Sequence, residues 1–326
     1  MSGRGPWLIA GKIVLSTALM AFVISRIPLD EMRHALVPAD ARLLAAAFGL
    51  LVLSNVLGSW QWDRLLQVVD IRIPFWKVCA YYHVGLFFNN FLPANIGGDI
   101  ARVLDASRYG VSRATAVSSV IMDRLIGTVA LAGLALVSTI PAIDRFHLGV
   151  VYLAVVAFFA VSVSMLWVVF HPALLPRLER LLARLGMRSL GPHLEDLAGR
   201  LQEYRGKRRT ILGLFALALV IQISRVGVHI LVARALGLHL PAAYFFLFVP
   251  LLAVIVSLPI SLNGIGVREG AGIVLFGLVG VGRAAAFSLQ FTTYLVAVAV
   301  SLLGGLLFLV RVPGRRAQAR ETGRSG

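Results

Sequence analysis

Long apolar runs separated by short polar or basic segments dominate this chain. Because about 20 apolar residues cross a bilayer once, the pattern predicts full spans at residues 8–25, 41–60, 114–140, 148–170, 211–236 and 285–310. Two shorter apolar runs, 75–91 and 244–258, end in segments rich in Pro, Gly and Asn. Broken backbone is tolerated at membrane depth only where protein or a polar cavity surrounds it. We therefore expect an all-α polytopic membrane bundle of about six full spans with two re-entrant hairpins.

The composition agrees with a membrane protein. Hydrophobic residues make up 59% of the chain and charged residues 14%, against about a quarter charged in soluble domains; the mean hydropathy is +0.86. A net charge of +16 would raise nucleic acid as a partner for a soluble protein. Here the basic residues lie in loops between apolar runs, as the positive-inside rule requires. We expect no nucleic acid partner, and a basic surface that favours anionic lipid headgroups.

The basic segments also predict the orientation. The linker 171–210 and the tail 311–326 are rich in Arg and should both be cytoplasmic. Running the spans between these two fixed points places the N-terminus inside as well, with the first hairpin entering from the cytoplasm and the second from outside. The run 8–25 has no convincing small-residue cleavage site after it, so we expect a retained anchor in the cell (inner) membrane.

An internal repeat follows from this arrangement within a single domain, 1–326. Span, hairpin and span in 41–140 correspond to span, hairpin and span in 211–310 with inverted orientation. The two hairpin tips have loosely similar sequences, LPANIGGDIAR from Leu92 and LPISLNGIGVREG from Leu258. Inverted repeats whose broken helices meet near the bilayer midplane are typical of transporters.

The first tip holds candidate binding groups. Gly97 and Gly98 would let backbone amides approach a ligand, and a helix beginning at Asp99 would direct its positive end at an anion. Arg102, one turn further on, could hold the same anion while Asp99 orients it or exchanges a proton. The alternative is structural: the glycines make the turn and Asp99 pairs with Arg102. Asn90 and Asn95 add polar groups to this hairpin.

The second tip carries a similar set, with a structural salt bridge of Arg268 as the alternative. Its candidate residues are Asn263, Gly264, Gly266, Arg268 and Glu269.

Three more ionisable residues lie inside predicted spans, where such residues are functional candidates by default. Asp123 and Arg124 are adjacent, so their side chains point about 100° apart, and we expect one to face a cavity and the other to pair with a neighbouring helix. Arg225 is a partner for Asp123 or Asp99, or a second headgroup ligand.

No motif for catalysis or metal binding stands out. The sequence contains no HExxH, GxSxG, Walker loop or acidic metal pair at a usable spacing, and Cys79 is its single cysteine, which excludes an intramolecular disulfide. We expect no enzyme activity, no cofactor and no catalytic residue.

Two separated motifs carry a family resemblance. NNFLPANIGGDIARVLDASRYG, followed by a span with Asp123 and Arg124, and later PISLNGIGVREG, resemble the transmembrane region of the lysylphosphatidylglycerol synthase family, also called flippase-like domain proteins. The resemblance implies a role in moving phospholipids or polyprenyl glycolipids between leaflets, and it points to the tip residues named above. No stretch of this sequence resembles the soluble aminoacyl-transferring domain of fused members, so lipid lysylation is not implied.

The sequence thus predicts a lipid translocase that receives an anionic headgroup where the two tips meet. Movement would be downhill or coupled to an ion, because no ATP site is visible. The alternatives are an intramembrane enzyme acting on a lipid phosphate and a non-catalytic scaffold for a membrane glycosyltransferase.

Overall fold

The computed structural model describes residues 39–89, 96–110, 112–142, 146, 149–171, 191–257 and 266–310. These residues form α-helices and no strand. The helices are α3 (Ala41–Val68), α4 (Phe75–Asn89), α5 (Ile96–Ala106), α6 (Arg113–Thr139), α7 (Gly149–Phe170), α9 (Gly191–Gln202), α10 (Arg208–Ala235), α11 (Ala242–Ser257), α12 (Val267–Gly277) and α13 (Arg283–Val310). Single 3₁₀ turns occupy Ser107–Tyr109, Ile140–Ala142 and Arg205–Lys207.

Five helices in the described part of the chain are long and apolar enough to cross a membrane, namely α3, α6, α7, α10 and α13. They coincide with the spans predicted from residue 41 onward, which confirms the all-α polytopic bundle. The predicted span 8–25, most of the linker 171–210 and the tail 311–326 lie outside the described residues.

Local sequence sets the helix ends. Asp40 caps α3 by accepting hydrogen bonds from the backbone N–H groups of Arg42 and Leu43, and the hydroxyl of Ser112 caps α6 in the same way. Gly266 begins α12 with φ +81°, a conformation that glycine adopts without steric cost.

The helix α3 continues to Val68, well past the end of the predicted span at 60. Its last turns are polar but buried, because Gln61 and Asp63 turn inward and find hydrogen-bond partners in Asp123 and Gln67. These polar residues after position 60 therefore belong to a buried hydrogen-bond network and do not end the helix.

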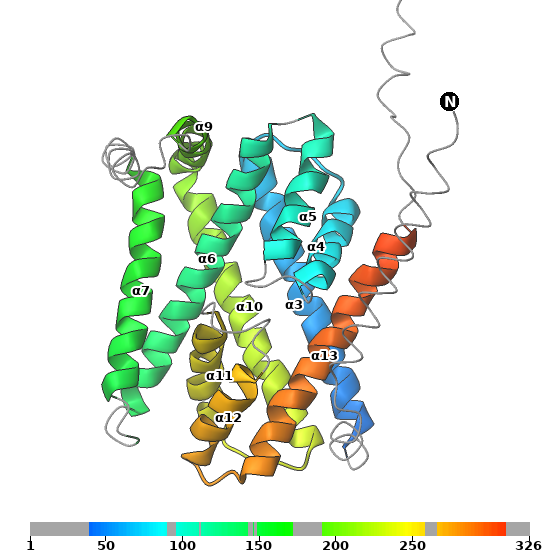
Figure 1. The fold of residues 1–326 in the computed structure, drawn as a ribbon, viewed down its shortest axis with the longest axis vertical. Coiled ribbons are helices and arrows are strands. Elements are labelled where there is room, and N and C mark those ends of the chain that lie inside the picture. Colours follow the sequence, from blue (N-terminus) through cyan, green and yellow to red (C-terminus); the bar gives the residue numbers. More distant parts are fainter. Residues whose placement is uncertain are drawn as a thin grey trace, which may run out of the picture.

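The two short helix pairs occupy opposite halves of the bundle (Figure 1). The pair α4 and α5 fills the half that contains the end of α3, and α11 with α12 fills the half that contains the end of α10. The end of α4 and the start of α5 face the middle of the molecule, as do the end of α11 and the start of α12. These helix pairs occupy the two segments in which the sequence predicts re-entrant hairpins, and the connecting tips 90–95 and 258–265 lie outside the described residues.

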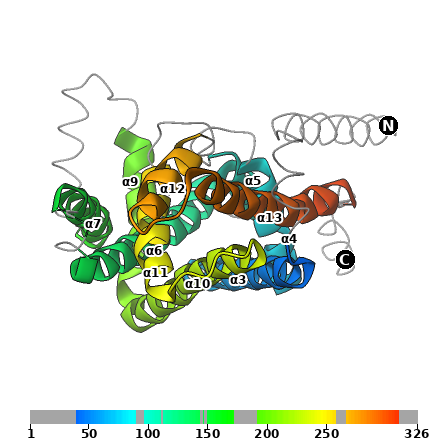
Figure 2. The same cartoon turned by 90° about the horizontal axis from the view of Figure 1, so that it is seen from below.

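Helix packing follows a two-fold pattern. The first helices of the two halves, α3 and α10, run side by side with the most extensive contact in the bundle (Figure 2). The helix α4 packs against α13, and its counterpart α11 packs against α6. Exchanging α3, α4, α5 and α6 with α10, α11, α12 and α13 therefore maps the packing onto itself, as an inverted-topology repeat requires.

Small residues make the closest approaches possible. A Cβ on Gly304 of α13 would collide with the backbone carbonyl of His83 on α4, and one on Gly98 of α5 would collide with the carbonyl of Gly85 on α4. Membrane helices rely on such glycines because close van der Waals packing replaces the hydrophobic effect between them. The helix α7 lies at the edge of the bundle in both views and exposes large apolar side chains such as Leu153 and Trp167, as a lipid-facing helix does.

Candidate functional site

A buried ion pair joins the first hairpin to its own half. The Arg102 guanidinium of α5 donates to Asp123 of α6 at 2.7 Å, and the other oxygen of Asp123 accepts from the Gln61 amide of α3 at 2.8 Å. Arg102 and Asp123 are only 5% and 8% exposed. The guanidinium lies 4.3 Å from the ring centroid of Trp62 and 4.9 Å from that of Tyr82, so two aromatic faces stabilise a cation that burial would otherwise disfavour.

A second pair, Asp99 with Arg124, lies beside the first on the outer side of α5 and α6. The Arg124 Nε atom is 2.9 Å from one oxygen of Asp99, and its Nη2 atom is 3.0 Å from the other. This fork geometry fixes both side chains. Asp99 to Arg102, in contrast, is a long contact of 3.8 Å.

These two pairs change the sequence-based expectation for Asp123 and Arg124. Both residues pair with α5, one on the inside and one on the outside. Asp123 and Asp99 are each engaged by another arginine, so neither is the ion-pair partner of Arg225 in this structure.

A wide groove runs along the outer pair. It has a volume of about 510 Å³ and lies between α5, α6 and α7. Apart from the Asp99 and Arg124 pair its walls are almost entirely apolar; among them are Ile100, Val103, Val117, Leu125 and Met165. The Arg124 side chain remains 46% exposed, so an apolar groove with a polar edge faces α7.

The glycines of the first tip serve the hairpin itself. The backbone N–H of Gly98 donates to the Asn89 side chain at 2.7 Å, and Gly98 packs on Gly85. Gly97 is buried in the first turn of α5. The Gly98 amide is therefore used between α4 and α5, which differs from the expectation that both glycine amides face a ligand. Asn90 and Asn95 lie outside the described residues.

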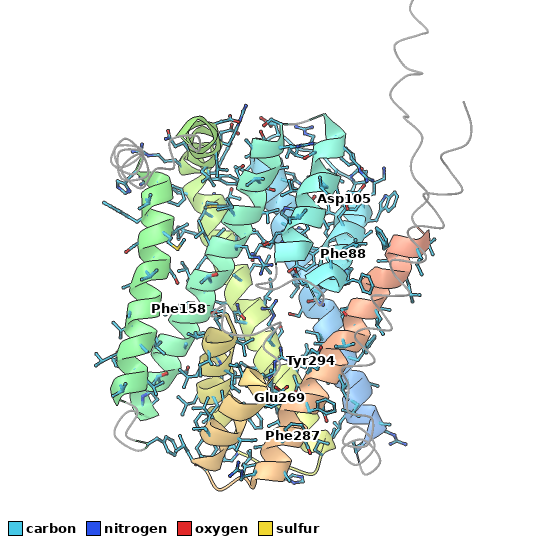
Figure 3. All side chains as sticks on the ribbon, in the orientation of Figure 1. Phe88, Asp105, Phe158, Glu269, Phe287 and Tyr294 are labelled. Atoms are coloured by element: carbon cyan, nitrogen blue, oxygen red, sulfur yellow. The ribbon has the colours of Figure 1, made fainter. Side chains whose placement is uncertain are left out.

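In the second half, Glu269 acts as a helix cap. Its carboxylate accepts from the N–H of Gly266 at 2.7 Å, and the side chain is buried in the lower half of the molecule, near Tyr294 (Figure 3). The Arg268 guanidinium lies 4.8 Å from the ring centroid of Tyr294 on α13. Asn263 and Gly264 lie outside the described residues.

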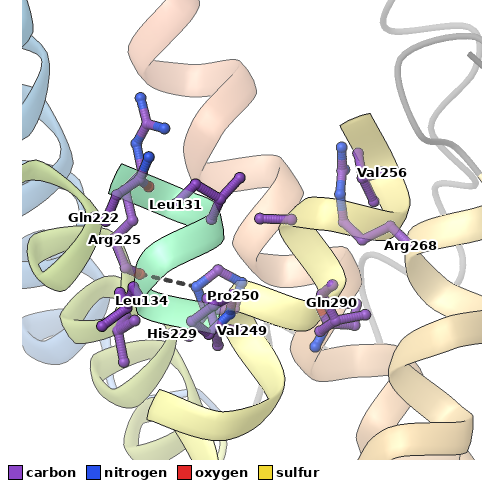
Figure 4. A pocket seen from close by; sticks show the side chains of 13 residues that line it. Leu131, Leu134, Gln222, Arg225, His229, Val249, Pro250, Val256, Arg268 and Gln290 are labelled. Carbon is purple, nitrogen blue, oxygen red and sulfur yellow. Dashed lines mark hydrogen bonds between the residues drawn. The ribbon is translucent and has the colours of Figure 1, made fainter. Parts of the chain in front are cut away.

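A separate pocket of about 190 Å³ gathers the polar groups of this half. Arg225 reaches it from α10 and Arg268 from α12 (Figure 4). Neither Asp nor Glu is among the described residues that line it; these are Leu131, Leu134, Gln222, Arg225, Val226, His229, Val249, Pro250, Leu252, Ala253, Val256, Arg268 and Gln290.

Gln222, His229 and Gln290 line this pocket but were not among the predicted site residues, whereas Arg225 was. Gln222, Arg225 and His229 follow one another at helical spacing, so they share a face of α10. The His229 Nδ1 atom bonds to the backbone carbonyl of Arg225 at 2.9 Å, and the Gln222 amide donates to the carbonyl of Gly127 at 3.2 Å. The signal that could have revealed Gln290 is its amide within an apolar span, since such polar residues face the bundle interior.

Comparison with known proteins agrees with this architecture. Residues 9–305 match the family described as the lysylphosphatidylglycerol synthase TM region. The chain belongs to this family. One relative, the UPF0104 membrane protein PH1989 of Pyrococcus horikoshii, is 25% identical over 325 residues, covering 91% of this chain and 95% of its own length. Membership confirms an integral membrane protein of the family that the two tip motifs resemble.

Proposed function

We propose that this member of the lysylphosphatidylglycerol synthase TM region family is a lipid translocase. It would move a phospholipid or polyprenyl lipid with an anionic headgroup between leaflets of the cell membrane. The observation that carries the proposal is the groove between α5, α6 and α7, whose apolar walls meet the half-exposed pair of Asp99 and Arg124. Hydrocarbon chains fit such walls, and a headgroup fits the charged edge.

The two-fold packing of the helices supports alternating access. One half, with its hairpin, would rock against the other, as in transporters built from inverted repeats. No chemical step on the lipid is assigned to any side chain. The basic residues at the α9 end would hold that end at the cytoplasmic leaflet, where anionic lipids attract them.

Reconstituted vesicles test the proposal. Phosphatidylcholine vesicles carry a trace of phosphatidylglycerol with a fluorescent acyl chain, and dithionite bleaches the outer leaflet. We expect the protein to expose the inner-leaflet probe with an unchanged lipid mass. A changed lipid mass would instead indicate an enzyme that acts on the lipid. If the inner-leaflet probe stayed as protected as in protein-free vesicles, with its mass unchanged, the result would favour the non-catalytic scaffold.

Arg124→Gln is the informative variant, because it opens the groove pair at a half-exposed position. We expect transport to fall several-fold. Arg283→Gln removes the same charge at the exposed start of α13 and is the matched control. Arg102→Ala is less suitable, since it would strand the buried carboxylate of Asp123 and disturb folding.

A further inference from the structure

We infer that the pocket of Arg225 and Arg268 binds the phosphate of the lipid, together with a hydroxyl group of its headgroup. This inference rests on the proposed function and specifies it, because it adds a headgroup site in the second half to the groove edge of Asp99 and Arg124 in the first.

Positive charge lines the pocket. Arg225 and Arg268 both reach it, and the charge of the neighbouring Glu269 acts on Arg268. None of the ion pairs between described residues includes Arg225. A cation beside a small cavity inside a membrane bundle attracts an anion strongly, because the surroundings screen it little.

Gln290 gives an independent indication of a ligand. Its side chain is fully buried and lines the pocket (Figure 4), yet neither its amide nitrogen nor its oxygen has a hydrogen-bond partner in the described chain. Buried polar groups are rarely left unpaired, because each loses its hydrogen bonds to water. A ligand with both an acceptor and a donor would pair the two atoms.

His229 favours the same kind of ligand. A carbonyl only accepts, so the Nδ1 atom that bonds to the Arg225 carbonyl carries the hydrogen, and Nε2 of the neutral ring is an acceptor. The pocket therefore offers donors to phosphate oxygens from the arginines and Gln290, and acceptors for hydroxyl groups from Gln290 and His229. A phosphate ester with a glycerol or sugar headgroup matches this set, whereas a choline headgroup has no donor.

The size of the pocket agrees with this class. A volume of about 190 Å³ lies below the 300–1,000 Å³, approximately, of pockets that enclose drug-sized ligands. It accommodates a headgroup and leaves the hydrocarbon chains outside.

Binding of short-chain lipids to the purified protein in detergent tests the inference. The probes are dihexanoylphosphatidylglycerol, dihexanoylphosphatidylcholine and inorganic phosphate. We expect the glycerol lipid to bind most tightly, and Arg225→Gln or Arg268→Gln to weaken it by about tenfold or more, the loss expected for one charge-assisted contact to phosphate. Arg234→Gln, at an exposed position of the same helix α10, should bind normally.

Gln290→Met distinguishes a ligand contact from a structural residue. Methionine keeps the unbranched shape but has no amide, so the unfolding temperature should stay the same or rise while affinity for the glycerol lipid falls. Normal affinity in both arginine variants would overturn the site, and equally tight binding of inorganic phosphate would overturn the hydroxylated headgroup. Should Arg268→Gln unfold the protein, because Arg268 stacks on Tyr294, Arg225→Gln decides alone.

The two proposals fail separately. Wild-type protein that binds the glycerol lipid through these residues but moves no lipid in vesicles would keep the site and end the translocase proposal. Undiminished transport in both arginine variants would keep the translocase proposal and end the assignment of this pocket as the phosphate site.

Discussion

At the scale of single residues, the glycines of the structure have roles that the sequence did not predict. The glycines of the tip motif were expected to open backbone amides to a ligand. In the structure Gly98 lets α5 approach α4, and Gly304 lets α13 approach the backbone of His83. The absence of a side chain serves packing at both positions.

Gly304→Ala should therefore destabilise the protein, because the new methyl group has no room against a backbone carbonyl. Overpacking of this kind costs about 1–3 kcal/mol, which a lower unfolding temperature in detergent would reveal. Gly49→Ala on α3 is the control, since a Cβ there meets nothing within 4 Å and alanine favours a helix by about 0.5–1 kcal/mol over glycine. Equal unfolding temperatures for the two variants would contradict the close packing of α13 on α4.

At the scale of elements, the pair of Arg102 and Asp123 joins the first hairpin to α6, and Gln61 extends the connection to α3. This pair is enclosed by Trp62 and Tyr82. We interpret it as the contact that holds α4 and α5 in one arrangement relative to the long helices.

Asp123→Asn should destabilise the protein by about 3–5 kcal/mol, because it removes the carboxylate at 2.7 Å from the buried Arg102 and leaves only that of Asp99 at 3.8 Å. The double variant Arg102→Met with Asp123→Leu should recover most of that stability, since apolar replacements of a buried pair are often neutral. Chemical or thermal unfolding in detergent measures both. If Asp123→Asn unfolded like the wild type and lost only lipid binding, Arg102 would belong to the ligand site instead.

The sequence predicted the positions of the helices better than the ion-pair partners of the charged residues. Apolar runs located α6, α7 and α13 to within about three residues, because a bilayer requires length and hydrophobicity. The sequence could not predict which arginine pairs with each aspartate, since the pairing depends on how α5 is rotated relative to α6. It also expected the two tips to share one site, and these tips, 90–95 and 258–265, lie outside the described residues.

At the scale of the whole molecule, charge is distributed unevenly between the two ends. The end that contains α9 carries many exposed basic residues; among them are Arg64, Arg72, Arg108, Arg205, Lys207, Arg208 and Arg209. Arg42, Arg234 and Arg283 lie at the opposite end. By the positive-inside rule we expect the α9 end to face the cytoplasm, so that α4 with α5 would enter the membrane from that side and α11 with α12 from the other.

Cysteine labelling tests this topology. In a Cys79→Ser background, cysteines at Arg72 and Arg108, before α4 and after α5, should react with an impermeant maleimide only in inside-out vesicles. Cysteines at Ala242 and Arg283, at the start of α11 and after α12, should react only in right-side-out vesicles. All four positions are exposed in the structure, so detergent should make them equally reactive. If Arg72 and Arg108 were labelled from opposite sides, α4 and α5 would cross the membrane rather than return, and the two halves of the repeat would not both contain a re-entrant hairpin.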